Sequence, residues 1–196
     1  MLFLAPVVIM PLFNKFEPLE DGELKEKITT YAEKEKFSLK GVYTMDGSKR
    51  STKSNAFFTG FGKFRRIVLF DTLVEKHTAD ELLVILAHEM GHFKKKHIFK
   101  MIVTSILMMG VTLYFLQLAL NFEGLFTAFG VETMSTHIGL LLFSLLFIPI
   151  NMITGLYSSY KSRKHEFEAD QYAVETTGLH QEMSDALKKL SVDNLS

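Results

Sequence analysis

Two histidines four residues apart, with a glutamate directly after the first, are the residues in this sequence best suited to chemistry. They are His88, Glu89 and His92, in the segment HEMGH. Residues four apart on an α-helix share a face, so both imidazoles can reach one metal ion. Glu89 adjoins the first histidine and can act as a general base on water without binding the metal itself. A pair of solvated histidines is the alternative, but it does not explain why the apolar residues 82–87 lead directly into the motif.

A catalytic zinc ion has three protein ligands and one open position, so a third ligand is expected. The chain contains no Cys, which leaves His, Glu or Asp. The extended pattern HExxHxxGxxH is absent, because Ile98 stands at the place of its last histidine. The third ligand must therefore come from farther along the chain, and the acidic segment SRKHEFEADQYA at residues 162–173 is its natural source.

If this segment is helical, Glu166 and Asp170 share one face. One of them can bind zinc while the other accepts a hydrogen bond from the second ring nitrogen of a ligand histidine. Glu168 lies about 200° around the helix from Glu166 and should point away, and His165, a possible ligand by type, lies about 100° from it. We predict one zinc ion per chain, bound by the two histidines of HEMGH and by Glu166, with Asp170 as the bracing acid.

Patterns around the motif predict the elements that hold it. Residues 20–36 have the spacing of an amphipathic helix. Residues 55–60 and 66–70 are predicted to form the two arms of a β-hairpin. Thr78 and Glu81 form a capping box, which should start the helix that runs through HEMGH. We place the remaining histidines at surface or boundary positions: His77, His97, His137 and His180.

Two long runs without a charged residue follow, at 101–120 and 138–160. Each is long enough to cross the hydrocarbon core of a bilayer. Two such runs joined by a short loop are better explained as a transmembrane hairpin than as buried helices of a soluble protein. Pro149 should kink the second span, and Asn151 should face protein or water rather than lipid.

The charges on either side of this hairpin predict its orientation. The connecting loop, residues 121–137, contains two Glu and neither Lys nor Arg. Lys and Arg accumulate on the cytoplasmic side of membrane proteins, so both outer flanks and the HEMGH site are expected there. The membrane would be that of the endoplasmic reticulum in a eukaryote and the cell membrane in a prokaryote. The basic flanks consist of Lys94, Lys95, Lys96 and Lys100 before the first span, and Lys161, Arg163 and Lys164 after the second.

Composition and run lengths predict a mainly α, integral-membrane fold. Residues 1–13 are predicted to form an apolar, membrane-associated segment, with a buried core segment as the alternative. They are too short to span a bilayer alone and are a poor signal peptide. Residues 14–100 form a zinc-peptidase region with the β-hairpin and the HExxH helix, 101–160 the transmembrane hairpin, and 161–196 the helix with the third ligand. The 22 basic and 22 acidic residues balance, which gives no support to a nucleic-acid partner.

Three separated segments also carry a resemblance to a known family. SNAFFTGFGKFRRIVLFDTLVEK, LAHEMGHFKKKH and SRKHEFEADQYA occur in this order and resemble the type I CAAX prenyl proteases, which are integral-membrane zinc endopeptidases. In that family the third zinc ligand is the Glu of an SRxxExxAD pattern, which corresponds to Glu166, and its Asp corresponds to Asp170. The resemblance also suggests that Asn55 and Ala56 line a strand edge with which an extended substrate can pair, and an ordinary scaffold strand is the alternative.

The resemblance implies cleavage of prenylated proteins or other peptides that end in a CAAX sequence, with release of the last three residues at a membrane. Family members have further spans before the position of Met1, and a His-Pro element near the active site after the position of Ser196. Two alternatives stay open. One is an HtpX-like membrane quality-control protease that acts on unmodified substrates. The other is a non-catalytic membrane scaffold that binds peptides or lipids.

Overall fold

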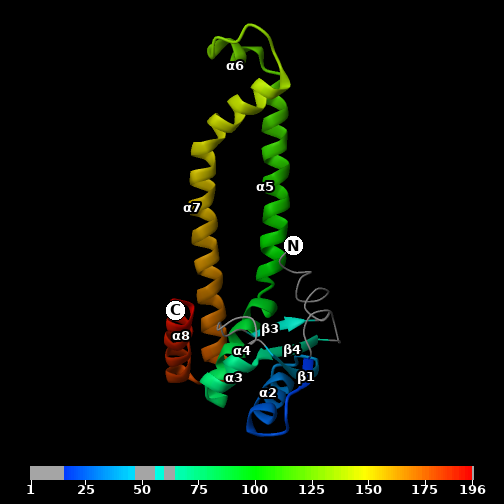
Figure 1. Ribbon diagram of the computed structural model, residues 1–196, viewed down its shortest axis with the longest axis vertical. Helices are drawn as coiled ribbons and strands as arrows, with labels where there is room; N and C mark the ends of the chain where they lie inside the picture. The colour runs from blue at the N-terminus through cyan, green and yellow to red at the C-terminus, as the bar shows by residue number, and fades with distance from the viewer. Residues whose placement is uncertain (1–15, 47–55, 60–64, 196) are drawn as a thin grey trace. The chain divides into compact units, whose positions relative to one another are not determined.

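The computed structural model describes residues 16–46, 56–59 and 65–195. The chain divides into two compact units, which are described separately. The first comprises residues 1–92 and 168–196, and contains a small sheet with helices. The second comprises residues 93–167, and is a helical hairpin. The predicted architecture, mainly helical with a small sheet, is confirmed (Figure 1).

The first unit contains a four-stranded sheet with the order β1-β2-β4-β3. Its strands are β1 (Phe16–Pro18), β2 (Leu39–Met45), β3 (Ala56–Thr59) and β4 (Arg65–Phe70). The predicted β-hairpin is confirmed as the antiparallel pair β3 and β4, whereas β1 and β2 were not predicted. β2 runs parallel to β4, with Val42 opposite Ile67. The central strand β4 has strands on both sides, and its last four residues are all buried.

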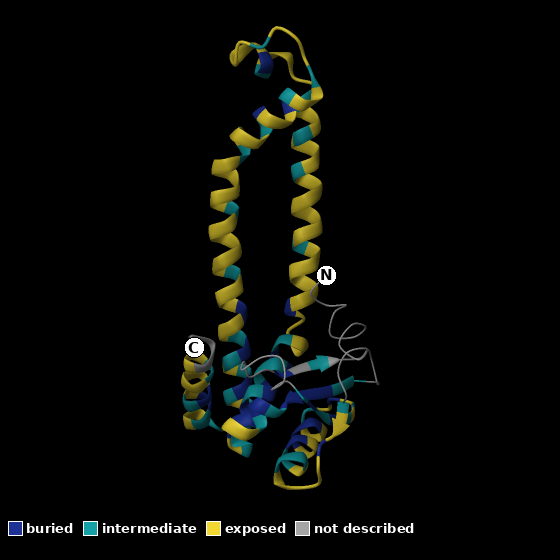
Figure 2. Ribbon diagram, viewed as in Figure 1, coloured by how far each residue is buried: buried dark blue, intermediate teal, exposed yellow. Residues whose placement is uncertain are grey.

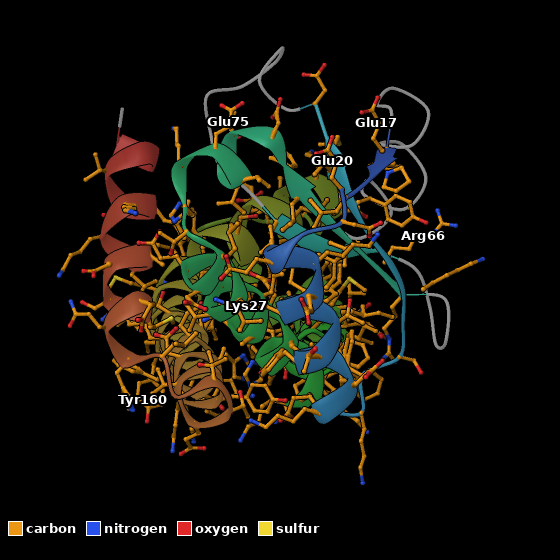
Figure 3. The ribbon with its side chains drawn as sticks, turned by 90° about the horizontal axis from the view of Figure 1, so that it is seen from below. Glu17, Glu20, Lys27, Arg66, Glu75 and Tyr160 are labelled. Carbon is orange, nitrogen blue, oxygen red and sulfur yellow. The ribbon has the colours of Figure 1, made fainter. Side chains whose placement is uncertain are left out.

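Among the described residues, the helices before α5 are α2 (Glu23–Lys34), α3 (Asp71–Lys76) and α4 (Ala79–Lys94). α2 lies within the predicted helix 20–36 and buries Ile28 in one apolar core with Ile67 of β4 and Leu82 of α4. Figure 3 shows Lys27 of α2 on the side towards α4, where its Nζ lies 2.7 Å from Asp80. Apolar burial and this ion pair together hold α4 beside α2 and the sheet.

The predicted capping box at the start of α4 is confirmed. The backbone N–H of Glu81 donates to Oγ1 of Thr78 at 3.3 Å, and the N–H of Thr78 donates to Oε2 of Glu81 at 2.9 Å. These two bonds satisfy donors that a helix terminus leaves without an intrahelical acceptor. α4 therefore starts at the predicted place and carries HEMGH in its last turns.

The hairpin unit contains α5 (His97–Leu120), α6 (Glu123–Ala128) and most of α7 (Thr136–Thr177). α5 and α7 are long and apolar enough to cross a membrane, and apolar side chains are exposed along both (Figure 2). Pro149 lies inside α7, and Figure 1 shows the helix bending in its yellow stretch. α7 is continuous over 42 residues, so one helix carries both the second apolar run and the acidic segment.

α7 ends in the first unit, where α8 (His180–Leu195) follows it. Gly178 has a φ of +76°, and its N–H donates to the carbonyl of Val174 at 2.8 Å. This left-handed conformation is easily reached only without a Cβ, so a glycine suits the end of this helix. Met183 and Ala186 of α8 are buried in a second apolar cluster. The same cluster contains Ala32 of α2 and Val84 and Ala87 of α4.

Two of the four histidines assigned to surface or boundary positions were wrongly placed. His137 and His180 are exposed, as expected. His77 is buried because its ring lies beside the Glu81 carboxylate, with Nδ1 3.3 Å from Oε2. His97 is only 1% exposed because its ring stacks on that of His165 in the hairpin unit.

Candidate metal centre

His88 and His92 lie on consecutive turns of α4, and their rings converge. Their Nε2 atoms are 3.1 Å apart. Two nitrogen ligands at the usual 2.0–2.1 Å from a tetrahedral zinc ion would lie about 3.3 Å apart. The pair therefore has nearly the spacing that a shared metal ion requires, and the nitrogens already face each other.

Asp170, near the C-terminal end of α7, contacts the other nitrogen of His88. Its Oδ1 lies 2.7 Å from Nδ1, and the two side chains are 33% and 15% exposed. A carboxylate accepts a hydrogen bond, so the contact favours the tautomer with the proton on Nδ1. The Nε2 of His88 then keeps its lone pair, which points towards His92.

The close approach of α4 and α7 in this unit depends on small residues. A Cβ on Gly91 would lie 3.1 Å from the Cα of Ala169 and 3.1 Å from Cδ1 of Tyr172. Ala169 is fully buried. The sequence analysis missed this role for Gly91, although a glycine inside a helix, which costs about 1 kcal/mol relative to alanine, is a signal for it.

The other predicted site residues fall in different environments. Glu89 is half-buried on α4, one residue after His88. Glu166 is exposed on α7, one turn before Asp170, and Glu168 between them is half-buried. The α-helix is unbroken across these acids, which is the geometry on which the choice of Glu166 rested.

The predicted substrate edge is described only in part. Ala56 is buried at the start of β3 and pairs with Leu69 of β4. β3 is the last strand in the sheet order, so its other side is an edge of the described sheet. Asn55 lies outside the described residues.

The sequence matches peptidase family M48 over residues 18–196. The chain belongs to this family. It is 42% identical to the "CAAX prenyl protease 1 homolog" of Arabidopsis thaliana, covering 100% of this chain and 46% of that protein. It is 41% identical to "CAAX prenyl protease 1" of Saccharomyces cerevisiae, covering 98% of this chain and 46% of that one. This M48 chain thus spans about half the length of the curated relatives that it matches.

The fold of this M48 chain is also similar to that of a solved structure. The chain matches the crystal structure of S. mikatae Ste24p with a TM-score of 0.81 and 40% identity. The match covers 99% of this chain and 48% of the other. Membership of M48 implies a metal ion, and the converging imidazoles of α4 fit that implication.

Hydrogen bonds outside the motif also position the end of α7 in this M48 chain. The hydroxyl of Tyr172 donates to Oε2 of Glu35 at 2.6 Å, and the hydroxyls of Tyr31 and Thr176 are 2.6 Å apart. Burial and the bond to Glu35 raise the pKa of Tyr172 above its ordinary value, so its hydroxyl remains a donor even where a free tyrosine would ionise. These contacts tie α7 to α2, and sequence reasoning missed them because they join residues more than 130 positions apart.

A second missed cluster supports the start of α4. Nζ of Lys189, on α8, lies 2.7 and 2.8 Å from the two carboxylate oxygens of Glu81. Burial raises the pKa of Glu81, but the bonds from Lys189 and from the Thr78 N–H outweigh it and lower the pKa overall. The capping glutamate thus also binds the last helix to the helix that carries HEMGH.

Proposed function

We propose that this chain is the catalytic part of a membrane-embedded zinc metalloendopeptidase. The observation that carries the proposal is the arrangement on α4, in which two Nε2 atoms lie 3.1 Å apart and Asp170 holds the far side of one ring. A paired, braced set of imidazoles is a common feature of zinc sites. The M48 match supports the same class of enzyme.

Three residues would hold the metal: His88, His92 and Glu166. Asp170 contacts His88, and Glu166 precedes it by one turn, about 6 Å along the same helix face. A glutamate also has a longer reach than an aspartate, which suits ligation from a second helix. One zinc ion per chain would complete the site, and its chemistry is Lewis-acid activation of water and of the scissile carbonyl.

The chain's own residues account for the proton transfers. Glu89 takes the proton of the attacking water and delivers it to the departing amine. It can do so without binding the metal because it adjoins the ligand His88 on the helix. Asp170 keeps the His88 proton on Nδ1, so that Nε2 remains free of a proton and able to bind the metal.

The substrate proposal comes from the relatives. Both named curated relatives are called CAAX prenyl proteases, which supports a prenylated protein ending in a CAAX sequence as the substrate. The cut would release the last three residues. Pairing of an extended substrate with the β3 edge, near Asn55 and Ala56, would position the scissile bond by main-chain hydrogen bonds.

The membrane proposal follows from α5 and α7. Their length and composition suit two membrane spans. The basic residues at their outer ends support a zinc site on the cytoplasmic side. Membrane lipid would therefore surround α5 and α7 and is a partner of the protein. The balanced charge gives no support to a nucleic-acid partner.

The test is cleavage by the purified full-length protein of a CAAX peptide in prenylated and unprenylated forms. We expect near-stoichiometric zinc, preferential cleavage of the prenylated form, and loss of activity on the order of 10²-fold or more in Glu89→Gln with zinc retained. Equal cleavage of both forms would favour the quality-control alternative. A protein without bound zinc and without activity would favour the scaffold.

A further inference from the structure

A groove runs between α5 and α7 within the hairpin unit. Its volume is about 520 Å³, and all the residues that line it belong to residues 93–167. Two lysines, Lys100 of α5 and Lys161 of α7, line it together with hydroxyl and apolar side chains. The groove therefore combines a cationic region with an apolar wall.

The stacked histidines of the hairpin unit show that the two lysines lie at one end of this groove. The rings of His97 and His165 are 4.2 Å apart between centroids and 7° from parallel. α5 leads away from this stack and α7 returns to it. Lys100 is three residues after His97, and Lys161 is four residues before His165. At 1.5 Å per residue, both lysine backbones lie about 5 Å from the stack, on the side of the apolar runs.

The same register orders the rest of the lining. Thr104 and Ser158 are each seven residues from the stack, which is about 10 Å along the helices. Met108 and Phe147 line the groove farther on. The two ammonium groups thus stand at the basic end, and beyond them apolar side chains are mixed with hydroxyl and amide groups, with Thr154 as far from the stack as Met108. A cationic end followed by a longer, mostly apolar wall suits the headgroup and an acyl chain of a phospholipid.

The charge balance at this end favours an anionic occupant. Seven Lys and Arg residues stand at the outer ends of the two apolar runs, and the only carboxylate near them within residues 93–167 is Glu166. The other two acids of this unit lie in the connecting loop. Basic pockets between membrane helices on the cytoplasmic side suit anionic lipid headgroups.

We propose that the groove between α5 and α7 binds one anionic phospholipid, with its phosphate between Lys100 and Lys161 and an acyl chain along Met108 and Phe147. Ser158 would donate a hydrogen bond to its phosphate or ester oxygens, whereas the hydroxyl of Thr104 donates to the carbonyl of Lys100 at 2.8 Å. The site lies outside the peptidase chemistry. It requires α5 and α7 to cross the membrane, but it does not require zinc or catalysis.

Native mass spectrometry of the full-length protein in detergent tests the proposal, with dioleoylphosphatidylserine, dioleoylphosphatidylcholine and inorganic phosphate as separate probes. We expect one phosphatidylserine per protein, bound about 10-fold or more tightly than phosphatidylcholine, since each lysine near an anionic lipid favours binding. The variant Lys100→Gln/Lys161→Gln should lose about 10-fold or more of this affinity. The variant Lys100→Arg/Lys161→Arg should retain the affinity for phosphatidylserine, because both positive charges remain. It also controls for the effect of substitution itself at the two positions.

The matched control is Lys95→Gln/Arg163→Gln, which removes two charges from the same end of the hairpin outside the groove. It should keep most of the affinity. An equal loss in this control, equal binding of the two lipids, or displacement of phosphatidylserine by millimolar inorganic phosphate would overturn the proposal. Extraction of the wild-type protein from membranes by alkaline carbonate would show that α5 and α7 do not span the bilayer, and it would overturn the lipid site as well, whereas loss of zinc or of activity alone would not.

Discussion

Gly91 of α4 and Ala169 of α7 pack so closely that a methyl group on Gly91 would lie 3.1 Å from the Cα of Ala169 and 3.2 Å from its carbonyl oxygen. Each residue sits beside a residue of the candidate centre, since Gly91 precedes His92 and Ala169 precedes Asp170. The spacing of the two helices, and with it the contact between Asp170 and His88, thus depends on the absence of one side chain.

Gly91→Ala is expected to push the helices apart. Overpacking of this kind costs about 1–3 kcal/mol, and the backbone atoms it meets cannot rotate away. We expect a lower unfolding temperature and weaker zinc binding, measured by thermal denaturation and by titration against a chelator. Gly110→Ala is the control, because a Cβ there meets nothing within 4 Å. If Gly91→Ala matched Gly110→Ala in both measurements, the close approach would have no role.

The three acids of the α7 segment should differ in their effect on zinc. Glu166→Gln should abolish tight binding because a ligand is lost. Asp170→Asn should weaken it about 10–100-fold, since a brace on His88 is lost but the ligands stay. Glu168→Gln should change it little. Zinc affinity of the three variants, measured with a competing chelator, checks this order, and a largest effect from Glu168→Gln would withdraw Glu166 as the ligand.

Glu81 should make stability depend on acid pH. Its pKa is lowered in the folded protein from a reference of 4.5, so its charged form stabilises the fold above that pH. This contribution falls as the pH drops from about 4.5 through the lowered folded pKa. Glu81→Gln should lower the free energy of unfolding at pH 7 by about 1.5–3 kcal/mol, the range for hydrogen bonds to charged groups, and flatten its acid dependence.

The control for this measurement is Glu75→Gln, an exposed glutamate on α3 (Figure 3). It should leave the stability curve between pH 3 and 7 nearly unchanged, because surface substitutions change stability by about 0.5 kcal/mol or less. Chemical denaturation at a series of pH values compares the two variants. A parallel loss at all pH values in Glu81→Gln would mean that its charge is not involved.

Labelling of introduced cysteines checks the orientation of the hairpin. The native chain has no Cys, so each introduced thiol reports one position. Cysteines at residues 124–130 should react only from the non-cytoplasmic side, and those at 94–96 only from the cytoplasm, because the basic residues flank the outer ends. Labelling of both sites from the same side of the membrane would contradict a transmembrane hairpin.

The sequence by itself determined the local features of this protein. The capping box of Thr78 and Glu81 set the start of α4, and the apolar run that follows placed His88 and His92 one turn apart on it. Charge-free runs of sufficient length predicted the two long apolar helices. Such features depend on residues within one or two helical turns of each other, and their spacing is visible in the chain.

Tertiary structure alone decided the relationships between distant segments. It placed Asp170 against His88 and Lys189 against Glu81, and it added the strands β1 and β2 to the predicted hairpin. It also buried His77, which the sequence had placed at the surface or boundary. Such contacts depend on how closely the helices approach each other, as at Gly91. The sequence near a charged or polar residue does not indicate which distant residue will pair with it in the folded protein.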